Sequence, residues 1–253
     1  MQYPLNKIED TVKPDYLSIW CIIIIHPVLR VVWLFANYTK LTPNQITVAS
    51  FTFGLASAFC FLQGNWTYLI IGACLFETSY ILDCVDGKIA RLKGSKSAVG
   101  AYLDIVGDVI SKFIVAFCLI LGQYLLTNDV SYFLWGVPYI FLQTVSYLSG
   151  ATLHRLEDEF YKQNLYKNPN NYAVANNFIR SKFPFASKIV RHLHARGLSL
   201  NPLTQTEAQT VALFICPMLI QVKIGLLLGS IITFGEALVF ALFYFLIKWR
   251  RKI

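Results

Sequence analysis

The sequence predicts an all-α, polytopic membrane protein, and three observations support this fold class. The chain is 56% hydrophobic and only 14% charged, with a mean hydropathy of +0.52, which is too apolar for an ordinary water-soluble domain. Its apolar residues gather in runs of about 20 residues, the length of a helix that crosses a bilayer. Its basic residues gather in a few connecting segments, so the net charge of +8 reports orientation in a membrane and not binding to nucleic acid.

The first apolar stretch, residues 16–39, differs from the others because it contains Arg30 and is interrupted by Pro27. A proline inside a helix removes a hydrogen bond and bends the helix. We therefore expect a bent helix that lies along the cytoplasmic interface, the alternative being a first transmembrane helix. Residues 1–41 then form an interfacial segment and residues 42–253 the transmembrane domain. The mixed, polar start of the chain indicates no cleavable signal peptide.

Six further apolar segments are near the length of a membrane-spanning helix, although the fifth is short. Lys and Arg are frequent in alternate connections and in the C-terminal tail. Since cytoplasmic loops carry the excess of basic residues, both ends of the transmembrane domain are expected to face the cytoplasm. The predicted spans are residues 45–63, 67–90, 99–125, 131–153, 208–222 and 224–247.

Four aspartates stand where a membrane protein rarely tolerates them. Asp83 and Asp86 end the second predicted span, and Asp104 and Asp108 begin the third. Spacings of three and four residues place each pair on one face of its helix, and the short connection predicts that the two helices are antiparallel neighbours. Because a carboxylate near hydrocarbon is costly, four converging carboxylates predict a divalent-cation site. All-oxygen ligands favour magnesium, manganese or calcium.

The residues from Asp83 to Asp108 follow the pattern D-x2-D-G-x2-A-R-x8-G-x3-D-x3-D. This stretch resembles the signature of the CDP-alcohol phosphotransferases at all eight fixed positions and at every spacing. The segment TPNQIT, which begins at Thr42, is similar to the TPNxxT element that opens the first span in that family. The resemblance covers the interfacial helix and the six-span core, but not residues 154–207 or the tail.

The resemblance implies a metal-dependent transferase of phospholipid biosynthesis. Such an enzyme moves a phosphatidyl or phospho-alcohol group from a CDP-alcohol to an acceptor hydroxyl and releases CMP. The donor is CDP-diacylglycerol or a CDP-linked polar alcohol, and the acceptor is a lipid or a polar alcohol. One or two Mg²⁺ or Mn²⁺ ions would neutralise charge that develops on the phosphates. The resemblance also implies a homodimer among membrane lipids, with its active site facing the cytoplasm, and we expect the inner membrane of a bacterium.

The resemblance also assigns roles to the motif residues. Asp83, Asp86 and Asp104 are the main metal ligands, and Asp108 shares a metal and is the general base for the acceptor hydroxyl. Small residues would let the pyrimidine lie close to the backbone, and an arginine can fork onto a phosphate. The implied nucleotide contacts are Pro43, Asn44, Thr47, Gly87, Ala90, Arg91 and Gly100.

Several of these residues have a second interpretation. The four acids would also suit a cation pathway in a transporter. Gly87, Ala90 and Gly100 would also suit close helix packing. Asn44 and Thr47 stand before or within the start of an apolar run, where such residues cap a helix.

Four charged residues in or beside the predicted spans have more than one possible role. Lys112, one turn after Asp108, could reach an acceptor phosphate or extend to the interface. Arg155 could bind a phosphate or flank a span on the cytoplasmic side. Glu77 and Glu236 stand inside apolar spans and predict a polar contact either within the bundle or in a dimer.

The acceptor is not fixed by the motif. Val109 follows the fourth aspartate, where branches of the family that use phosphorylated polyols often carry Arg or Lys, and this weakens a phosphorylated acceptor. The interfacial segment before TPNQIT is similar to that of the di-inositol-phosphate synthases, whose acceptor is a phosphoinositol. The two indications conflict, so the acceptor stays open.

Overall fold

The computed structural model describes residues 3–4, 8, 18–94, 98–162 and 204–250; the side chains of 98–105, 149–162 and most residues after 238 are outside this description. All regular structure in the described part is helical, which confirms the all-α class. Residues 163–203, most of the stretch 154–207 that the resemblance does not cover, fall outside the described residues. The elements are α2 (Ile19–Tyr38), α3 (Pro43–Gln63), α4 (Trp66–Leu92), α5 (Ala98–Thr127), α6 (Ser131–Lys162), α9 (Gln205–Gln209), the π-helical turn η1 (Thr210–Ile215), α10 (Cys216–Met218) and α11 (Val222–Arg250).

Local sequence sets both ends of α3. Thr42 and Gln45 form a capping box: the Gln45 N–H donates to Thr42 Oγ1, and the Thr42 N–H donates to Gln45 Oε1 at 2.9 Å. Gly64 ends the helix with a φ of 75°, a left-handed conformation that favours glycine. Asn65 then caps α4. The chain therefore reverses within three residues, and α3 and α4 lie side by side.

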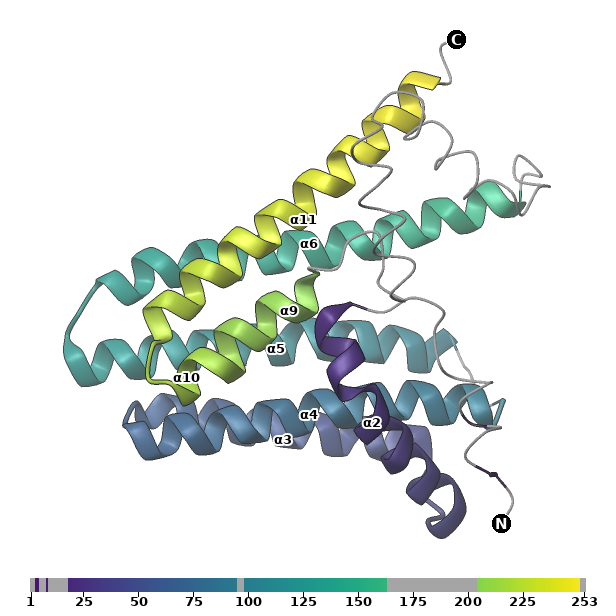
Figure 1. Cartoon of the computed structure of the whole chain (residues 1–253), viewed down its shortest axis with the longest axis horizontal. Helices are drawn as coiled ribbons and strands as arrows, with labels where there is room; N and C mark the ends of the chain where they lie inside the picture. The colour runs from purple at the N-terminus through teal and green to yellow at the C-terminus, as the bar shows by residue number, and fades with distance from the viewer. Residues whose placement is uncertain (1–2, 5–7, 9–17, 95–97, 163–203, 251–253) are drawn as a thin grey trace.

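α3 is the central helix of a trio with α4 and α5 (Figure 1). A Cβ atom on Gly122 of α5 would lie 2.1 Å from the carbonyl oxygen of Phe61 on α3. The Gln123 side chain also donates to the Gly64 carbonyl. A Cβ on Gly54 would lie 2.5 Å from Ser111 Oγ. Small residues thus let the helix backbones approach closely, as is common in membrane proteins.

α11 packs along α6, and polar side chains join the two helices in their buried interface (Figure 1). Gln143 Nε2 donates to Thr233 Oγ1 at 3.0 Å, and Ser146 Oγ donates to Glu236 Oε2 at 2.8 Å. The predicted polar contact of Glu236 therefore lies within the bundle. The segment from α9 to α10 packs against α11 on one side and α4 on the other.

α2 crosses the bundle obliquely and packs on α4 (Figure 1). Val28 and Val32 are buried against Val85 and Ile89 of α4. The helix continues through Pro27 from Ile19 to Tyr38, so the proline does not end it. Its start is tied to α4, because Trp20 Nε1 donates to Glu77 Oε1 at 3.0 Å. The predicted polar contact of Glu77 is also within the bundle.

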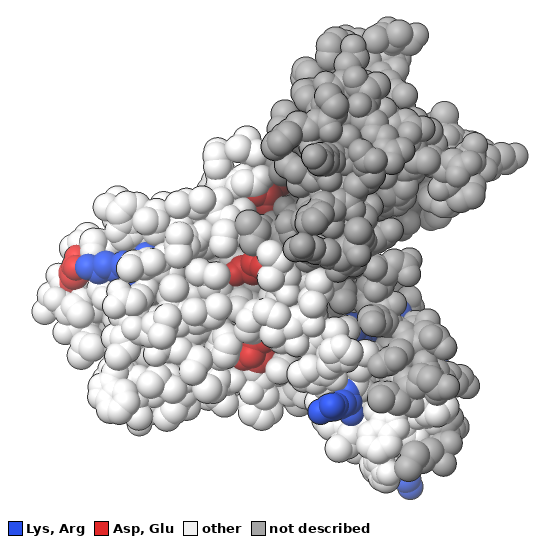
Figure 2. Space-filling view, viewed as in Figure 1, with Lys and Arg blue, Asp and Glu red and all other residues white. Residues whose placement is uncertain are grey.

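Within the described residues, four helices are long and apolar enough to cross a membrane. They include the segment that was expected to lie on the interface, so whether it lies on or spans the membrane stays open. Figure 2 shows a mostly uncharged face, as expected for a surface in contact with lipid. The four candidates are Ile19–Tyr38, Pro43–Gln63, Trp66–Leu92 and Val106–Thr127.

The fifth predicted span, 208–222, is short in the structure, as its length in the sequence predicted. The helical segment there contains α9, η1 and α10, with 5, 6 and 3 residues. At 1.5 Å per residue it is about 21 Å long, less than the ~30 Å of a hydrocarbon core. The chain turns after Met218, where Ile220 has a φ of 58°. Six complete spans therefore remain a prediction.

Candidate active site

The aspartates lie on the helices that the sequence predicted. Asp83 and Asp86 are in the second half of α4, and Asp104 and Asp108 are in the first half of α5. The prediction that α4 and α5 are direct neighbours needs a correction. Within the described residues, α3 packs against both of them, while α4 and α5 make almost no direct backbone contact. The small residues of α3 draw both helices to it, and this leaves space between α4 and α5.

A partly open cavity lies in this space, with about 450 Å³ of empty volume when its mouth is included. It brings together Asp83 from α4 and Asp108 from α5, as the sequence predicted for these two acids. Hydroxyl groups and small residues form much of the remaining lining. The lining residues are Thr47, Ser50, Phe51, Phe76, Ser79, Tyr80, Asp83, Gly107, Asp108, Ser111 and Lys112.

Asp86 is held by the first helix of the trio. Its side chain is buried, and Thr47 Oγ1 donates to Asp86 Oδ2 at 2.5 Å. A buried carboxylate is costly unless it is hydrogen-bonded, so Thr47 has a specific partner and does not serve as a helix cap. Thr42 caps α3, and Asn44 is exposed in its first turn. The TPNQIT segment therefore places one side chain directly on the aspartate motif.

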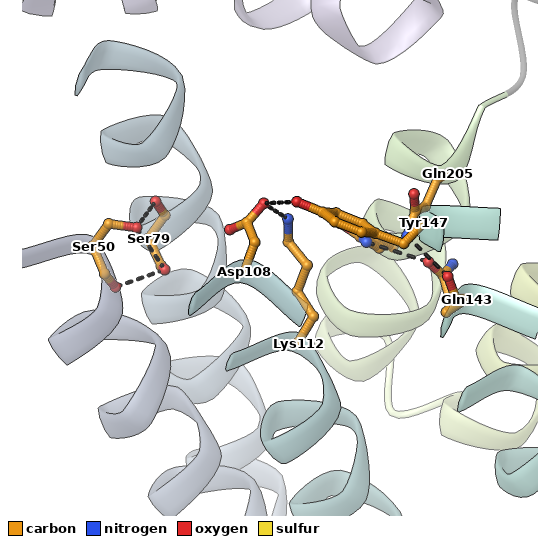
Figure 3. Close-up of polar contacts among 8 residues, drawn as sticks. Ser50, Ser79, Asp108, Lys112, Gln143, Tyr147 and Gln205 are labelled. Carbon is orange, nitrogen blue, oxygen red and sulfur yellow. Dashed lines mark hydrogen bonds and ion pairs between the residues drawn. The ribbon is translucent and has the colours of Figure 1, made fainter. Parts of the chain in front are cut away.

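Asp108 is contacted from two helices on one of its oxygens. Lys112 Nζ lies 2.5 Å from Asp108 Oδ2, and the Tyr147 hydroxyl of α6 donates to the same oxygen at 3.2 Å (Figure 3). Lys112 also lies 5.6 Å from the centre of the Tyr147 ring. Lys112 thus pairs with the aspartate one turn earlier, a spacing that favours ion pairs. The structure shows this contact, which neither expectation for Lys112 included.

Two serines that the sequence reasoning missed lie one turn below the motif residues. Ser50 Oγ donates to the Ser79 carbonyl at 2.8 Å, and Ser79 Oγ donates to the Ser50 carbonyl at 2.8 Å (Figure 3). Ser50 is three residues after Thr47, and Ser79 is four residues before Asp83, so same-face spacing could have found both. No local signal marks Tyr147, which is 39 residues from its partner.

The glycine of the motif faces open space. A Cβ on Gly87 would have no atom within 4 Å in the described structure, and the same holds for Gly107 in the cavity wall. Close helix packing therefore does not explain Gly87 there, whereas a small residue beside a bound planar group would. Ala90 is partly buried and Arg91 is exposed. The side chains of Asp104 and Arg155, and the surroundings of Gly100, lie outside the described part.

A metal site requires several acidic side chains that lie close enough to bind one ion. In the part of the chain with described side chains, no three His, Cys, Asp or Glu residues are placed to hold one ion together. Asp83 and Asp108 nevertheless share a cavity whose other polar groups are mainly hydroxyls. Such oxygen ligands are the kind that Mg²⁺ and Mn²⁺ prefer. The four-acid metal centre remains a prediction.

The fold is a bundle of long apolar helices, and two acidic side chains of the motif line a cavity within it. These features define the general class of this protein, a helical membrane protein with an acidic site. The profile of the CDP-alcohol phosphatidyltransferase family matches residues 40–247, and the chain belongs to this family.

Three characterised proteins illustrate the similarity. The chain is 39% identical over 69 residues to the bifunctional IPC transferase and DIPP synthase of Thermococcus kodakarensis, which is 27% of this chain and 15% of that protein. It is 32% identical over 82 residues to the archaetidylinositol phosphate synthase of Pyrococcus horikoshii, 32% of this chain and 42% of that protein. The chain therefore spans less than half of each relative. The CDP-DAG-bound phosphatidylinositol phosphate synthase of Mycobacterium tuberculosis gives a TM-score of 0.49 at 18% identity, over 84% of this chain and 90% of that one.

Proposed function

We propose that this protein transfers a phosphatidyl or phospho-alcohol group from a CDP-alcohol to an acceptor hydroxyl and releases CMP. One observation carries the proposal: Asp83 of α4 and Asp108 of α5, the first and last acids of the motif, line one cavity. The membership of the chain in the CDP-alcohol phosphatidyltransferase family supports the donor class.

Asp83, Asp86, Asp104 and Asp108 would hold one or two Mg²⁺ or Mn²⁺ ions. The hydroxyl and carboxylate lining of the cavity supports this assignment. Divalent ions would supply charge neutralisation at the diphosphate. Thr47 contributes by keeping the buried Asp86 carboxylate in place.

In the proposed reaction, Asp108 accepts the proton of the acceptor hydroxyl as that oxygen attacks the β-phosphorus of the donor. The bond from the β-phosphorus to the bridging oxygen breaks, and CMP leaves with that oxygen. Lys112 and Tyr147 fix one oxygen of Asp108, so the other is available to the acceptor. Asp108 then returns its proton to solvent.

The nucleotide would lie along α3 and α4. The open space beside Gly87 supports its place near the pyrimidine or ribose. Arg91 is exposed and can reach a phosphate. The proposed contacts are Pro43, Asn44, Thr47, Gly87, Ala90, Arg91 and Gly100.

The remaining proposals concern the membrane, the oligomeric state and the acceptor. The positive-inside pattern supports an active site on the cytoplasmic side, in our proposal of a bacterial inner membrane. We also propose a homodimer, with crosslinking in a native-like bilayer as its test; recovery of monomer alone would contradict it. The names of the relatives suggest an inositol-type alcohol as acceptor. Lys112 and Arg155 are the proposed contacts to it.

The test is release of CMP from CDP-diacylglycerol by the purified protein, with a panel of acceptors and with Mg²⁺ or Mn²⁺. Asp108→Asn should lower kcat by roughly 10²–10⁴-fold, the usual contribution of a general base, and should leave donor binding intact. Asp129→Asn, in the α5–α6 loop, is the matched control and should turn over normally. Near-parental turnover of Asp108→Asn would exclude its role as base. Cation flux in proteoliposomes without nucleotide, and no CMP from any donor, would favour a transporter.

A further inference from the structure

Each helix of the trio contributes one serine hydroxyl to the cavity between α4 and α5. Ser79 of α4 stands one turn before Asp83, and Ser111 of α5 stands one turn after Asp108. Because a single turn separates them, each serine lies on the same face of its helix as the acid. Ser50 of α3 completes the set, and all three serines line the cavity. We call these three residues the hydroxyl floor.

Two members of the hydroxyl floor can only accept further hydrogen bonds. Ser50 and Ser79 each donate their proton to the other's backbone carbonyl at 2.8 Å, and their Oγ atoms lie 3.2 Å apart. A hydroxyl has one proton and two acceptor lone pairs, so these oxygens offer lone pairs to the cavity. They therefore suit a guest that carries O–H donors, and they disfavour a phosphate oxygen, which is itself an acceptor.

The third member, Ser111, has a hydroxyl with no structural partner in the described part of the chain. The residue is partly buried and lines the cavity. A glycine makes room for it, because a Cβ on Gly54 would lie 2.5 Å from Ser111 Oγ and 3.4 Å from Ser79 Oγ. Since both oxygens approach the same point on α3, the hydroxyl floor is continuous across the three helices.

One oxygen of Asp108 is turned toward the hydroxyl floor. Lys112 and Tyr147 contact Asp108 Oδ2, and Figure 3 shows the other oxygen on the side of the Ser50–Ser79 pair. Asp83 lines the same cavity. Carboxylates and neutral acceptors therefore share one space.

This combination suits a cation that keeps part of its water shell. Mg²⁺ is usually bound through one or two carboxylates and retains several waters, because it dehydrates reluctantly. The protons of such waters point away from the ion and need acceptors. Phe51 and Phe76 form part of the remaining lining and offer none. The serines are the neutral acceptors placed beside the acids.

We propose that Ser50, Ser79 and Ser111 hold the water ligands of a divalent ion bound at Asp83 and Asp108, and that they thereby favour Mg²⁺ over Ca²⁺. Ca²⁺ accepts more ligands in a more flexible geometry and depends less on ordered waters. The serines are positioning residues, since they act through water and not on the ion or the substrate. This inference rests on the proposed metal centre and adds the source of its ion preference.

Ser111→Ala is the sharpest variant, because the hydroxyl it removes makes no bond that stabilises the described structure. Ser230→Ala is the matched control, since Ser230 is also partly buried but donates to the Leu226 carbonyl of its own helix, α11. Mg²⁺ and Ca²⁺ are titrated separately into the full chain in detergent, without nucleotide, and each Kd is measured by calorimetry. We expect the Mg²⁺ Kd of Ser111→Ala to rise about 10–100-fold, as when a partner of a metal-bound group is lost. The Ca²⁺ Kd should rise less than about threefold, and Ser230→Ala should change neither.

Ser111→Cys separates hydrogen bonding from shape. A thiol nearly keeps the shape of the side chain but is a weak acceptor, so this variant should lose Mg²⁺ affinity as Ser111→Ala does. The retained Ca²⁺ affinity of both variants shows that they are folded.

Three results would overturn the inference while the metal centre stands: an unchanged Mg²⁺ Kd in Ser111→Ala, equal losses for the two ions, or parental Mg²⁺ affinity in Ser111→Cys. If the parent binds neither ion, the proposed metal centre fails and the inference fails with it. Release of CMP from CDP-diacylglycerol then reports separately on the transferase function.

Discussion

The two halves of this bundle are joined in different ways. In the α3–α4–α5 trio, glycine and serine bring helix backbones together, with Gly122 against the Phe61 carbonyl and a reciprocal Ser50–Ser79 pair. Between α6 and α11, longer polar side chains make the bridges, as in Ser146–Glu236. A contact between two backbones leaves the helices little freedom to shift, whereas a hydrogen bond between side chains can be replaced by another one. The trio carries Asp83, Asp86 and Asp108 of the motif, and the α6–α11 pair, here called the polar half, carries buried hydrogen-bonded side chains.

The largest expected effect is in the trio. Gly122→Ala puts a Cβ 2.1 Å from a backbone oxygen, so α5 must move away from α3, and overpacking of this kind costs about 1–3 kcal/mol. Gly235→Ala is the control, because its Cβ meets nothing within 4 Å in the described structure. Thermal unfolding in detergent should show a loss only for Gly122→Ala. Equal midpoints for the two variants would remove the distinction between the halves.

The next effect concerns activity. Thr47→Val removes the donor to the buried Asp86 carboxylate, and a hydrogen bond to a charged group contributes about 1.5–3 kcal/mol. We expect CMP release to fall roughly tenfold or more, and Thr47→Ser to restore most of it. Restoration by serine separates the hydroxyl from the shape of the side chain. Full activity in Thr47→Val would contradict this role.

A smaller effect is expected in the polar half. Ser146→Ala removes the donor to Glu236, and hydrogen bonds between membrane helices average about 0.6 kcal/mol. Glu236→Gln combined with Ser146→Ala should recover part of the loss, since a neutral amide is less costly to bury than a carboxylate. Unfolding midpoints of the single and double variants measure this. A loss as large as that of Gly122→Ala would show that both halves are equally rigid.

The smallest effect lies at the far end of the bundle, where Lys223 pairs with Asp129 in the α5–α6 loop. The hydrogen bond from Lys223 lowers the pKa of Asp129 from 3.8 to about 2. A lowered pKa means that the pair stabilises the fold above pH 3.8 and that this contribution is lost as the pH falls toward 2. Lys223→Met should therefore flatten the change in unfolding midpoint across this window at low salt. An identical pH profile would show that the pair contributes nothing, as many exposed pairs do.

The sequence predicted the parts of this molecule that depend on local pattern. Apolar runs placed the ends of α3, α4 and α5 to within two residues, and the D-x2-D and D-x3-D spacings placed the acids on the right helices. Which helices pack against each other was harder to predict, because an evenly apolar helix does not specify which of its faces meets which neighbour. Thr47 contacts Asp86 across 39 residues, and Gln143 contacts Thr233 across 90. The separation of α4 from α5 follows from such contacts.

The π-helical turn at Thr210–Ile215 has a consequence for how this family member can change. A π turn accommodates one residue more than an α-helical turn, so removing one residue there would restore a regular α-helix and leave the residues before and after the turn on their present faces. Gln209 and Cys216, on either side of the turn, would keep their neighbours on α6 and α11. The turn is therefore a place where this segment can change its length by one residue without repacking the rest of the bundle.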